Sequence, residues 1–489
     1  MNKSNLLLTL ITLLFLFGCT QEKSLSAIFK EIDNEVVANS RAYATLGEAT
    51  STIGHRLTGS KNGAEAEEYT FNLLKSYGFN DVEYFPFEVE TWMRGDIELQ
   101  IGNINQRQYK TYSAVSLAHS PVTSEVDLEI IDMGNGLEAD YASNPGMVEG
   151  KIALVYIGIL PNSPEGTKNL HRSEKTALAT ENGAEGIIII NQVDGGVLLT
   201  GTASVTGRLI DIPAVCIGKE DGMALKETLK SRRKRAAIKM SNTANLIKAR
   251  NVIATIKGAE LPDEKVIVGG HLDSWDLATG AIDNGIGSFA VLDMARTFQA
   301  LDLRPKRTVE FIMFMGEEQG LLGSRAYVNA AVADGSINHI KYVMNQDMSG
   351  NPIGYNAGGR PEAVNFFDEI GAEIMAIDST TFKNENRNGA GLHSDHQPFM
   401  LQGIPYTASA SNLERHIYGC YHSDCDDFDL VNEEHMRNNV RFSSMMLYAL
   451  ADADQLPAEK LTDEETKAFL EGNGLKLKLK IGGDWRWED

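Results

Sequence analysis

The stretch of residues 266–287 constrains the fold of this chain more than any other. It opens with three consecutive apolar residues, a run typical of a strand buried on both faces, and a pair of glycines then breaks the run. His271 therefore follows the C-terminal end of a strand, and Asp273 and Asp283 lie in the glycine-rich loop beyond it. Because ligands gather beyond the carboxyl ends of strands in open α/β sheets, an imidazole and carboxylates here indicate the beginning of a metal site.

Similar strand-like runs recur between residues 249 and 452. The runs VIVGG, TVEFIMFM, YVMNQDM and IPYTASA alternate with helix-like segments, one of them over residues 284–300. This alternation predicts an α/β fold with a mixed, largely parallel sheet and helices on both of its faces. Earlier in the chain we expect a helix over residues 63–77, and the run VEYFPFEVETW predicts an edge strand because it contains Pro86.

Residues with metal-binding side chains follow the other strands of this region as well. A pair of glutamates follows VEFIMFM, an aspartate follows YVMNQ, and a histidine lies in the segment CYHSDCDDFD. Two imidazoles and four carboxylates without thiolates suit a pair of zinc ions, with Mn²⁺ or Co²⁺ as alternatives. The candidate set is His271, Asp283, Glu317, Glu318, Asp347 and His422.

This set is large enough for hydrolysis assisted by two metals. Two metal ions about 3.5 to 4 Å apart need one bridging carboxylate and about two further ligands each, which leaves one carboxylate for proton transfer. Neighbouring side chains such as Glu317 and Glu318 point in different directions, so one can bind a metal while the other faces the attacking water. Asp273 and Asp426 each lie near a candidate histidine in sequence, and we expect each to accept the proton of the ring nitrogen that binds no metal, although other aspartates compete with Asp426.

Residues 120–239 show a different pattern of predicted secondary structure, with short β-type runs and a single helix-like run over residues 174–182. Three segments of this region, residues 148–155, 183–188 and 212–215, resemble the protease-associated domain, a small β-rich module inserted in several exported peptidases. No cluster of reactive residues lies within it. We therefore expect the first part of the main domain over residues 19–119, the insertion over 120–243, the rest of the main domain over 244–453, and a tail over 454–489 in which LKLKLKI predicts a short strand.

The first 18 residues predict export. A short apolar segment follows Lys3 and ends at Gly18, which is too short for a membrane-spanning helix and typical of a secretion signal. Residues 16–19 resemble the bacterial lipobox, which implies that Cys19 carries a diacylglyceryl group and that lipid anchors the mature protein to a membrane. A plain signal peptide or an uncleaved anchor is the alternative. Thr20 favours the outer membrane of a bacterial cell envelope under the common sorting rule.

The charge and the cysteines narrow the classes of partner and compartment. A net charge of −22 argues against a nucleic-acid partner, because proteins that bind phosphates bring a basic face. With Cys19 assigned to the lipid, three cysteines remain and at most one disulfide can form within the chain. Cys420 and Cys425 are the expected pair, because they lie close together around His422 and an exported compartment permits disulfides. The sequence leaves the oligomeric state open.

The candidate residues resemble those of metallopeptidase family 28, whose members include co-catalytic di-zinc aminopeptidases and glutamate carboxypeptidases. The resemblance covers a stretch that begins at Arg56, before the insertion, and residues 251–432 after it. It implies a zinc-exopeptidase-like fold, and some members of the family also carry a protease-associated domain. For the site it implies a first zinc on His271 and Asp347, a second zinc on Glu318 and His422, Asp283 as the bridge, Glu317 as the general base, and Tyr421 as a stabiliser of the oxyanion.

The resemblance therefore implies an exported, lipid-anchored di-zinc exopeptidase that acts on peptides, with aminopeptidase activity as the first expectation. A dipeptidase or a glutamate carboxypeptidase-like enzyme is the close alternative, because the same metal site serves each activity. A glutaminyl cyclase is a further alternative, but its single-zinc chemistry makes less use of five ligands. A non-catalytic surface binding protein is the last alternative, and it would have no need of Glu317.

Overall fold

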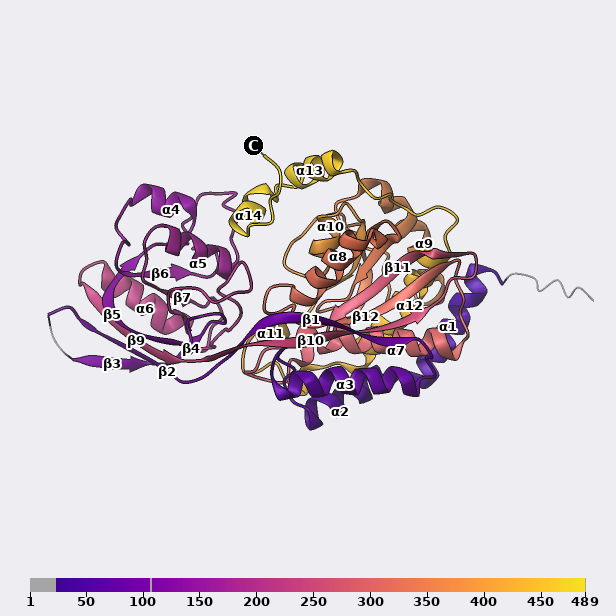
Figure 1. The fold of residues 1–489 in the computed structure, drawn as a ribbon, viewed down its shortest axis with the longest axis horizontal. Coiled ribbons are helices and arrows are strands. Elements are labelled where there is room, and N and C mark those ends of the chain that lie inside the picture. The colour runs from indigo at the N-terminus through magenta and orange to yellow at the C-terminus, as the bar shows by residue number, and fades with distance from the viewer. Residues whose placement is uncertain (1–22, 106–107, 489) are drawn as a thin grey trace, which may run out of the picture.

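The computed structural model describes residues 23–105 and 108–488, which form a large and a small lobe joined by two long strands (Figure 1). The expected signal and Cys19 lie outside the described residues. Every helix within the described ranges is too short or too polar to span a bilayer.

A mixed sheet, seven-stranded among the described residues, is the centre of the large lobe. Its middle strands are parallel, because β11 runs parallel to both of its neighbours, β12 and β13, and β13 runs parallel to β15. Antiparallel strands complete the two sides, and β1 with its Pro86 lies at one edge. In sheet order the strands are β1 (Val82–Met93), β10 (Thr243–Ile256), β12 (Arg307–Phe314), β11 (Leu261–His271), β13 (Ile340–Asn345), β15 (Tyr406–Ser411) and β14 (Pro352–Asn356).

Helices cover both faces of this sheet, which explains the unbroken apolar runs. Successive side chains of a strand point to opposite faces, so Val266 and Val268 of β11 belong to one core and Ile267 to the other. The first core is closed by α1 (Leu25–Asn39), α2 (Ala42–Thr52), α3 (Lys61–Ser76), α7 (Ile286–Ala300), α9 (Val364–Ile377) and α12 (Glu433–Asp452). The second is closed by α8 (Leu322–Asp334), α10 (His396–Met400) and α13 (Asp463–Gly472).

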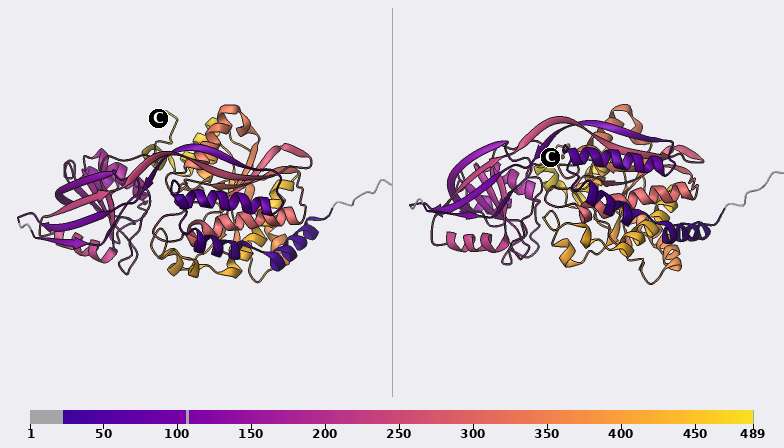
Figure 2. Two further views of the ribbon diagram at one scale, coloured as in Figure 1. Left: turned by 60° about the horizontal axis from the view of Figure 1, so that its bottom comes forward. Right: turned by 90° about the horizontal axis from the view of Figure 1, so that it is seen from below.

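The small lobe contains the second sheet. The chain enters this lobe through β1 and leaves it through β10, and these strands pair antiparallel from Val82 with Ala254 to Met93 with Thr243 (Figure 2). In sheet order its strands are β3 (Tyr109–Tyr112), β2 (Ile97–Asn103), β9 (Lys234–Ser241), β5 (Thr123–Asp132), β6 (Ile152–Tyr156), β7 (Gly186–Ile190), β8 (Ala214–Ile217) and β4 (Ala114–Ser116). Its helices are α4 (Glu138–Ser143), α5 (Arg172–Glu181) and α6 (Lys219–Leu229).

Two sequence-based expectations for this lobe differ from the structure. The small-lobe sheet begins at β2, before the expected boundary at residue 120, because β2 pairs with β9 and β4 pairs with β8. The sequence also predicted a single helix, whereas α4 and α6 accompany α5. The first, α4, has six residues, too few to show a helical period, and α6 contains Gly222, which lowers its helix propensity.

The C-terminal tail is helical, so the strand expected from LKLKLKI is wrong. This segment forms α14 (Lys476–Ile481). An alternating pattern also places apolar residues four apart, and in the helix Leu475 and Leu479 are 7% and 1% exposed whereas Leu477 is 45% exposed. The burial of one helical face therefore outweighs the alternation.

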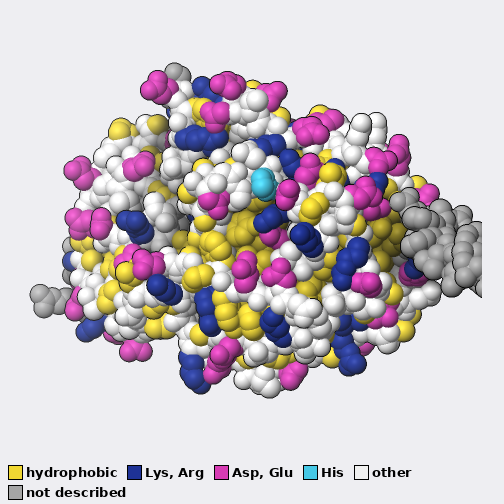
Figure 3. Space-filling view, turned by 45° about the vertical axis from the view of Figure 1, so that its right-hand side comes forward, with side chains coloured by type: hydrophobic (Ala, Val, Ile, Leu, Met, Phe, Trp, Pro, Cys, Tyr) yellow, Lys and Arg dark blue, Asp and Glu magenta, His cyan; other side chains and the backbone are white. Residues whose placement is uncertain are grey.

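The face drawn in Figure 3 carries no concentration of acidic side chains. On the face drawn in Figure 3, acidic and basic side chains are interspersed, with apolar side chains between them. The net charge of −22 therefore does not produce an acidic patch on this face.

Candidate active site

The candidate ligands meet at the C-terminal edge of the parallel strands. His271 is the last residue of β11, and Asp347 follows β13, the neighbouring strand. A Cβ atom at Gly270 would lie 2.5 Å from the carbonyl oxygen of Gln346. Glycine is therefore required at this position for the two strand ends to approach so closely.

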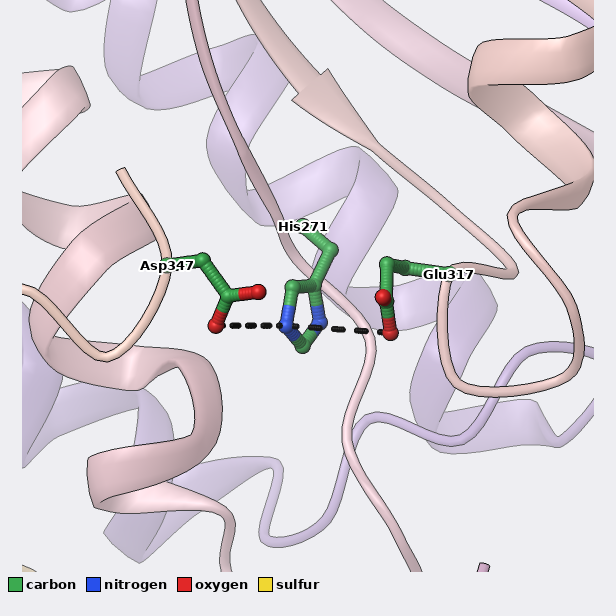
Figure 4. A group of neighbouring side chains, drawn as sticks. All are labelled: His271, Glu317 and Asp347. Atoms are coloured by element: carbon green, nitrogen blue, oxygen red, sulfur yellow. Dashed lines mark ion pairs between the residues drawn. The ribbon is translucent and has the colours of Figure 1, made fainter. Parts of the chain in front are cut away.

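His271 lies among three carboxylates. Its Nε2 atom is 3.5 Å from Oδ1 of Asp347 and 3.9 Å from Oε2 of Glu317 (Figure 4). The same nitrogen is 3.2 Å from Oδ1 of Asp283. One imidazole nitrogen thus shares a small space with oxygens from three separate loops, as a metal site requires.

His422 completes a second group of ligands. Its Nε2 atom is 3.0 Å from Oδ2 of Asp283 and 3.0 Å from Oε2 of Glu318. Asp283 therefore turns one oxygen toward each histidine, which is the arrangement of a carboxylate that bridges two cations.

This donor set fits two divalent cations. The carboxylates of Asp283, Glu317, Glu318 and Asp347 form ion pairs only with histidines within the described ranges. The Oε1 atom of Glu318 is buried and has no hydrogen-bond partner among the described residues. Buried carboxylates without cationic partners are costly, and oxygen and imidazole donors without thiolates suit a zinc pair.

Glu317 has the environment of a proton-transfer group. It lies beside His271 and lines the cavity described below. Burial raises the pKa of this carboxyl well above its usual value, His271 opposes that effect, and the nearby carboxylates of Asp347 and Glu318 add to it. A carboxylate with a raised pKa is a stronger base than an ordinary one, which suits the role of general base.

Asp273 orients His271, but through its main chain and not through the expected carboxylate. The backbone oxygen of Asp273 lies 3.0 Å from Nδ1 of His271, whereas its carboxylate Oδ1 lies 3.7 Å from that nitrogen. The carboxylate instead accepts the backbone N–H of Glu317 at 3.2 Å. Asp273 therefore orients the histidine through its main chain and the glutamate through its side chain, which makes it a positioning residue.

Two residues of the small lobe hold His422, and sequence reasoning missed both. The backbone N–H of Thr200 donates to the carbonyl of His422 at 2.8 Å, and the Thr200 carbonyl lies 3.3 Å from its Nδ1 atom. The Arg172 guanidinium approaches the same nitrogen at 3.0 Å. The sequence showed no reactive cluster in this region, because the partners lie more than 200 positions from His422.

The expectation that Asp426 orients His422 is wrong. Its carboxylate accepts the backbone N–H groups of Ile282 and Asp283 at 2.7 and 3.0 Å, and burial raises its pKa to about 7. Buried backbone N–H groups need acceptors, and the turn that carries Asp283 has two such N–H groups, which the Asp426 carboxylate satisfies.

A buried arginine supports the loop between His271 and Asp283. The Arg56 guanidinium donates to the carbonyls of Leu272, Thr279 and Gly280 at 2.6 to 2.8 Å. Burial lowers its pKa to about 10, and the surrounding carboxylates oppose that change. Nothing in the local sequence pattern around this arginine indicates that role.

Tyr421 and a disulfide flank His422. The Tyr421 ring stacks on the imidazole with centroids 3.8 Å apart, and the side chain lines the cavity. Burial raises the pKa of its hydroxyl, which therefore stays protonated and able to donate. Cys420 and Cys425 form a disulfide with a Cα–Cα distance of 5.2 Å.

A cavity of about 610 Å³ opens onto these residues. The large lobe supplies the candidate ligands, and the small lobe supplies a wall that includes Arg172 and Glu174. Residues of the C-terminal tail also line it. The volume is in the range of small-molecule sites, so it suits a short peptide better than a folded chain.

The fold and the site together define a zinc metallo-exopeptidase with two metal positions. Residues 251–447 match Peptidase family M28, and residues 123–225 match the PA domain. The chain is therefore similar to peptidase family M28 in its large lobe and to the PA domain in its small lobe. The resemblance, the α/β fold and the enzyme class expected from the sequence are confirmed.

The proteins that resemble this chain include some named carboxypeptidase and others named aminopeptidase. Carboxypeptidase Q from Bos taurus is 26% identical over 430 residues, which cover 86% of this chain and 87% of the relative. Leucine aminopeptidase 2 from Trichophyton rubrum is 29% identical over 366 residues, or 72% of this chain and 67% of the relative. Among solved structures, an aminopeptidase from Aneurinibacillus has a TM-score of 0.65 at 27% identity and covers 90% of this chain and 98% of its own. A peptidase M28 precursor from Shewanella amazonensis shares the fold with a TM-score of 0.74 at 22% identity, covering 90% of this chain and 99% of its own.

Proposed function

We propose that this protein is an aminopeptidase that releases N-terminal residues from short peptides. The observation that carries the proposal is the position of Asp283, whose two oxygens face His271 and His422 while Glu317 lies beside the first histidine. Similarity to leucine aminopeptidase 2 and to the Aneurinibacillus aminopeptidase supports the choice of the N-terminal end.

The chain's own residues divide the chemistry of peptide hydrolysis among them. When bound, two zinc ions supply a water of lowered pKa and a polarised peptide carbonyl. Glu317 accepts the proton of the attacking water and passes it to the leaving amine. Tyr421 donates its hydroxyl proton in a hydrogen bond to the oxyanion, and Asp273 keeps Glu317 and His271 in place.

A dipeptidase or carboxypeptidase is the second candidate, because the cavity contains a cationic side chain that could bind a substrate carboxylate. The Arg172 side chain lines the cavity and is 5% exposed, and its Nε atom has no hydrogen-bond partner among the described residues. A buried guanidinium without a carboxylate partner is suited to bind the C-terminal carboxylate of a substrate. Similarity to carboxypeptidase Q supports this candidate.

The same proposal includes the place of action. The lipobox-like residues 16–19 support export and a lipid anchor at Cys19, in a bacterial cell envelope and on its outer membrane. Replacement of Cys19 by serine is expected to move the protein from the membrane fraction to the soluble fraction. An unchanged distribution between the fractions would contradict the anchor.

A peptide panel tests the activity and separates the two candidates. The protein without residues 1–19 is assayed with and without zinc on peptides that are free or blocked at each end. Cleavage that requires a free N-terminus and tolerates a blocked C-terminus supports the aminopeptidase. A requirement for a free C-terminus, or activity confined to dipeptides, supports the second candidate. Absence of zinc-dependent cleavage across a broad panel would contradict both.

A further inference from the structure

The C-terminal tail runs along the large lobe, and its helix α14 lies at the seam between the two lobes (Figure 1). The region matched to peptidase family M28 ends at residue 447, before the tail begins. Even so, Lys478, Leu479, Gly482 and Asp484 of the tail line the cavity that holds the candidate ligands. The tail is therefore one wall of the substrate cavity.

An ion pair fixes this wall to the large lobe. Both carboxylate oxygens of Asp484 accept hydrogen bonds at 2.7 Å from the two terminal nitrogens of Arg325 in α8. Gln397 of α10 donates to the same carboxylate at 2.8 Å. A bidentate contact of this kind fixes direction as well as distance, so the segment after α14 has one defined position.

Apolar contacts tie the same helix to both lobes. Leu475 and Leu479 belong to the second core of the large lobe. Ile481 packs against the core of the small lobe, and α14 contacts α5, which begins with Arg172. The tail thus contacts both lobes beside the cavity that it lines.

Lys478 is the cation that this wall presents without a partner. It forms no hydrogen bond or ion pair with any residue of the described ranges, whereas Arg325, which also lines the cavity, is paired with Asp484. Its positive charge affects His171, which also lines the cavity. Burial lowers the pKa of His171 well below its usual value, and the charges of Arg172 and Lys478 add to that effect.

We propose that Lys478 is a specificity-determining residue that selects peptide substrates carrying a carboxylate on the side of the cavity formed by the tail. The inference rests on the proposed peptidase function and names its substrate class. An unpaired ammonium at the wall of a cavity of about 610 Å³ can reach the carboxylate of a short peptide that fills the cavity. The carboxylate can belong to the C-terminus or to an acidic side chain, because the ammonium binds both in the same way.

Substrate pairs that differ only in the carboxylate test this inference. Ala-Ala against Ala-Ala amide tests the C-terminal group, and Ala-Asp amide against Ala-Asn amide tests an acidic side chain. In the wild type, kcat/KM is expected to favour the carboxylate member of at least one pair by about tenfold, the effect of one charge-assisted contact. The zinc-dependent turnover of the wild type tests the peptidase function separately from this ratio.

Lys478→Met is expected to remove the preference, mainly through KM, with zinc content unchanged. Lys478→Arg should restore it, and Lys478→Glu should reverse it toward the uncharged member. Lys480→Met is the matched control, because Lys480 lies on the same helix but does not line the cavity, and it should keep the wild-type ratio. The inference is overturned if Lys478→Met keeps the wild-type ratio in both pairs, or if it lowers kcat/KM equally for both members.

Discussion

Asp426 holds the main chain of Asp283, whose backbone N–H donates to the Asp426 carboxylate at 3.0 Å. The second oxygen of the same carboxylate accepts the N–H of Ile282 at 2.7 Å, so the pair of bonds sets the turn from which Asp283 faces both histidines. The geometry of the bridging position therefore depends on a carboxylate that is bonded to the backbone of this turn.

Asp426→Asn should weaken zinc binding. An asparagine has one acceptor oxygen in place of two, so it satisfies one of the two N–H groups and leaves the other facing an NH₂ group. Loss of such a supporting contact lowers metal affinity by about 10- to 100-fold, which a competitive zinc titration measures. Asp424→Asn is the control, because this neighbouring aspartate is exposed. Equal zinc affinities of the two variants would show that Asp426 does not support the metal site.

Glu317→Gln and Asp283→Asn should separate proton transfer from metal binding. The first change keeps size and hydrogen bonding but removes the base, so kcat is expected to fall by about 10² to 10⁴ while two zinc ions per chain remain. The second removes a charge that faces both histidines, so zinc content should fall together with activity. Elemental analysis beside kinetics makes the comparison. Substantial turnover by zinc-loaded Glu317→Gln would exclude Glu317 as the base.

The positions of the candidate ligands could be anticipated from the sequence for a simple reason. His271 ends one buried strand and Asp347 follows the neighbouring one, and the ends of neighbouring parallel strands meet at one edge of a sheet. The supports of His422 could not be anticipated in this way. Thr200 is 222 positions away and acts through its main chain, which has the same chemistry at almost every residue.

Two errors show where local patterns stop being informative. Asp426 was one of several aspartates near His422, and only the fold decides that its carboxylate turns to the N–H groups before α7. Residues 476–481 alternate like a strand, but burial of Leu479 against the large lobe favours a helix. In both cases the deciding partner is remote in sequence.

Replacement of Cys420 and Cys425 by serine should loosen the second group of ligands. The disulfide closes the short loop that contains His422, and a loop of this length gains about 2 kcal/mol of stability from the cross-link. The free loop has to be ordered when zinc binds, so zinc should dissociate about tenfold faster, as a chelator-exchange assay measures. Cys216→Ala is the control, because this buried cysteine lies in β8 outside the site. An equal rate in the wild type and the double variant would show that the fold alone holds the loop.

His119→Asn should reduce the loss of folding stability that occurs as the pH becomes acidic. His119 is fully buried in the small lobe, with Nδ1 2.8 Å from the Thr202 hydroxyl and Nε2 without a hydrogen-bond partner in the described part of the chain. Burial lowers its pKa from 6.5 to about 4. Between these values the unfolded chain binds a proton that the folded chain does not, so stability falls as pH decreases through this window and is fully present above pH 6.5.

Asparagine has no such proton and tolerates the positive φ of 65° found at this position. From pH 7 to pH 5 the free energy of unfolding of the wild type should therefore decrease by about 2 kcal/mol more than that of the variant. Urea unfolding at the two pH values measures the difference, and comparison of the two proteins cancels the contributions of the other titrating groups. Parallel pH profiles would mean that His119 takes up its proton in the folded protein as readily as in the unfolded chain.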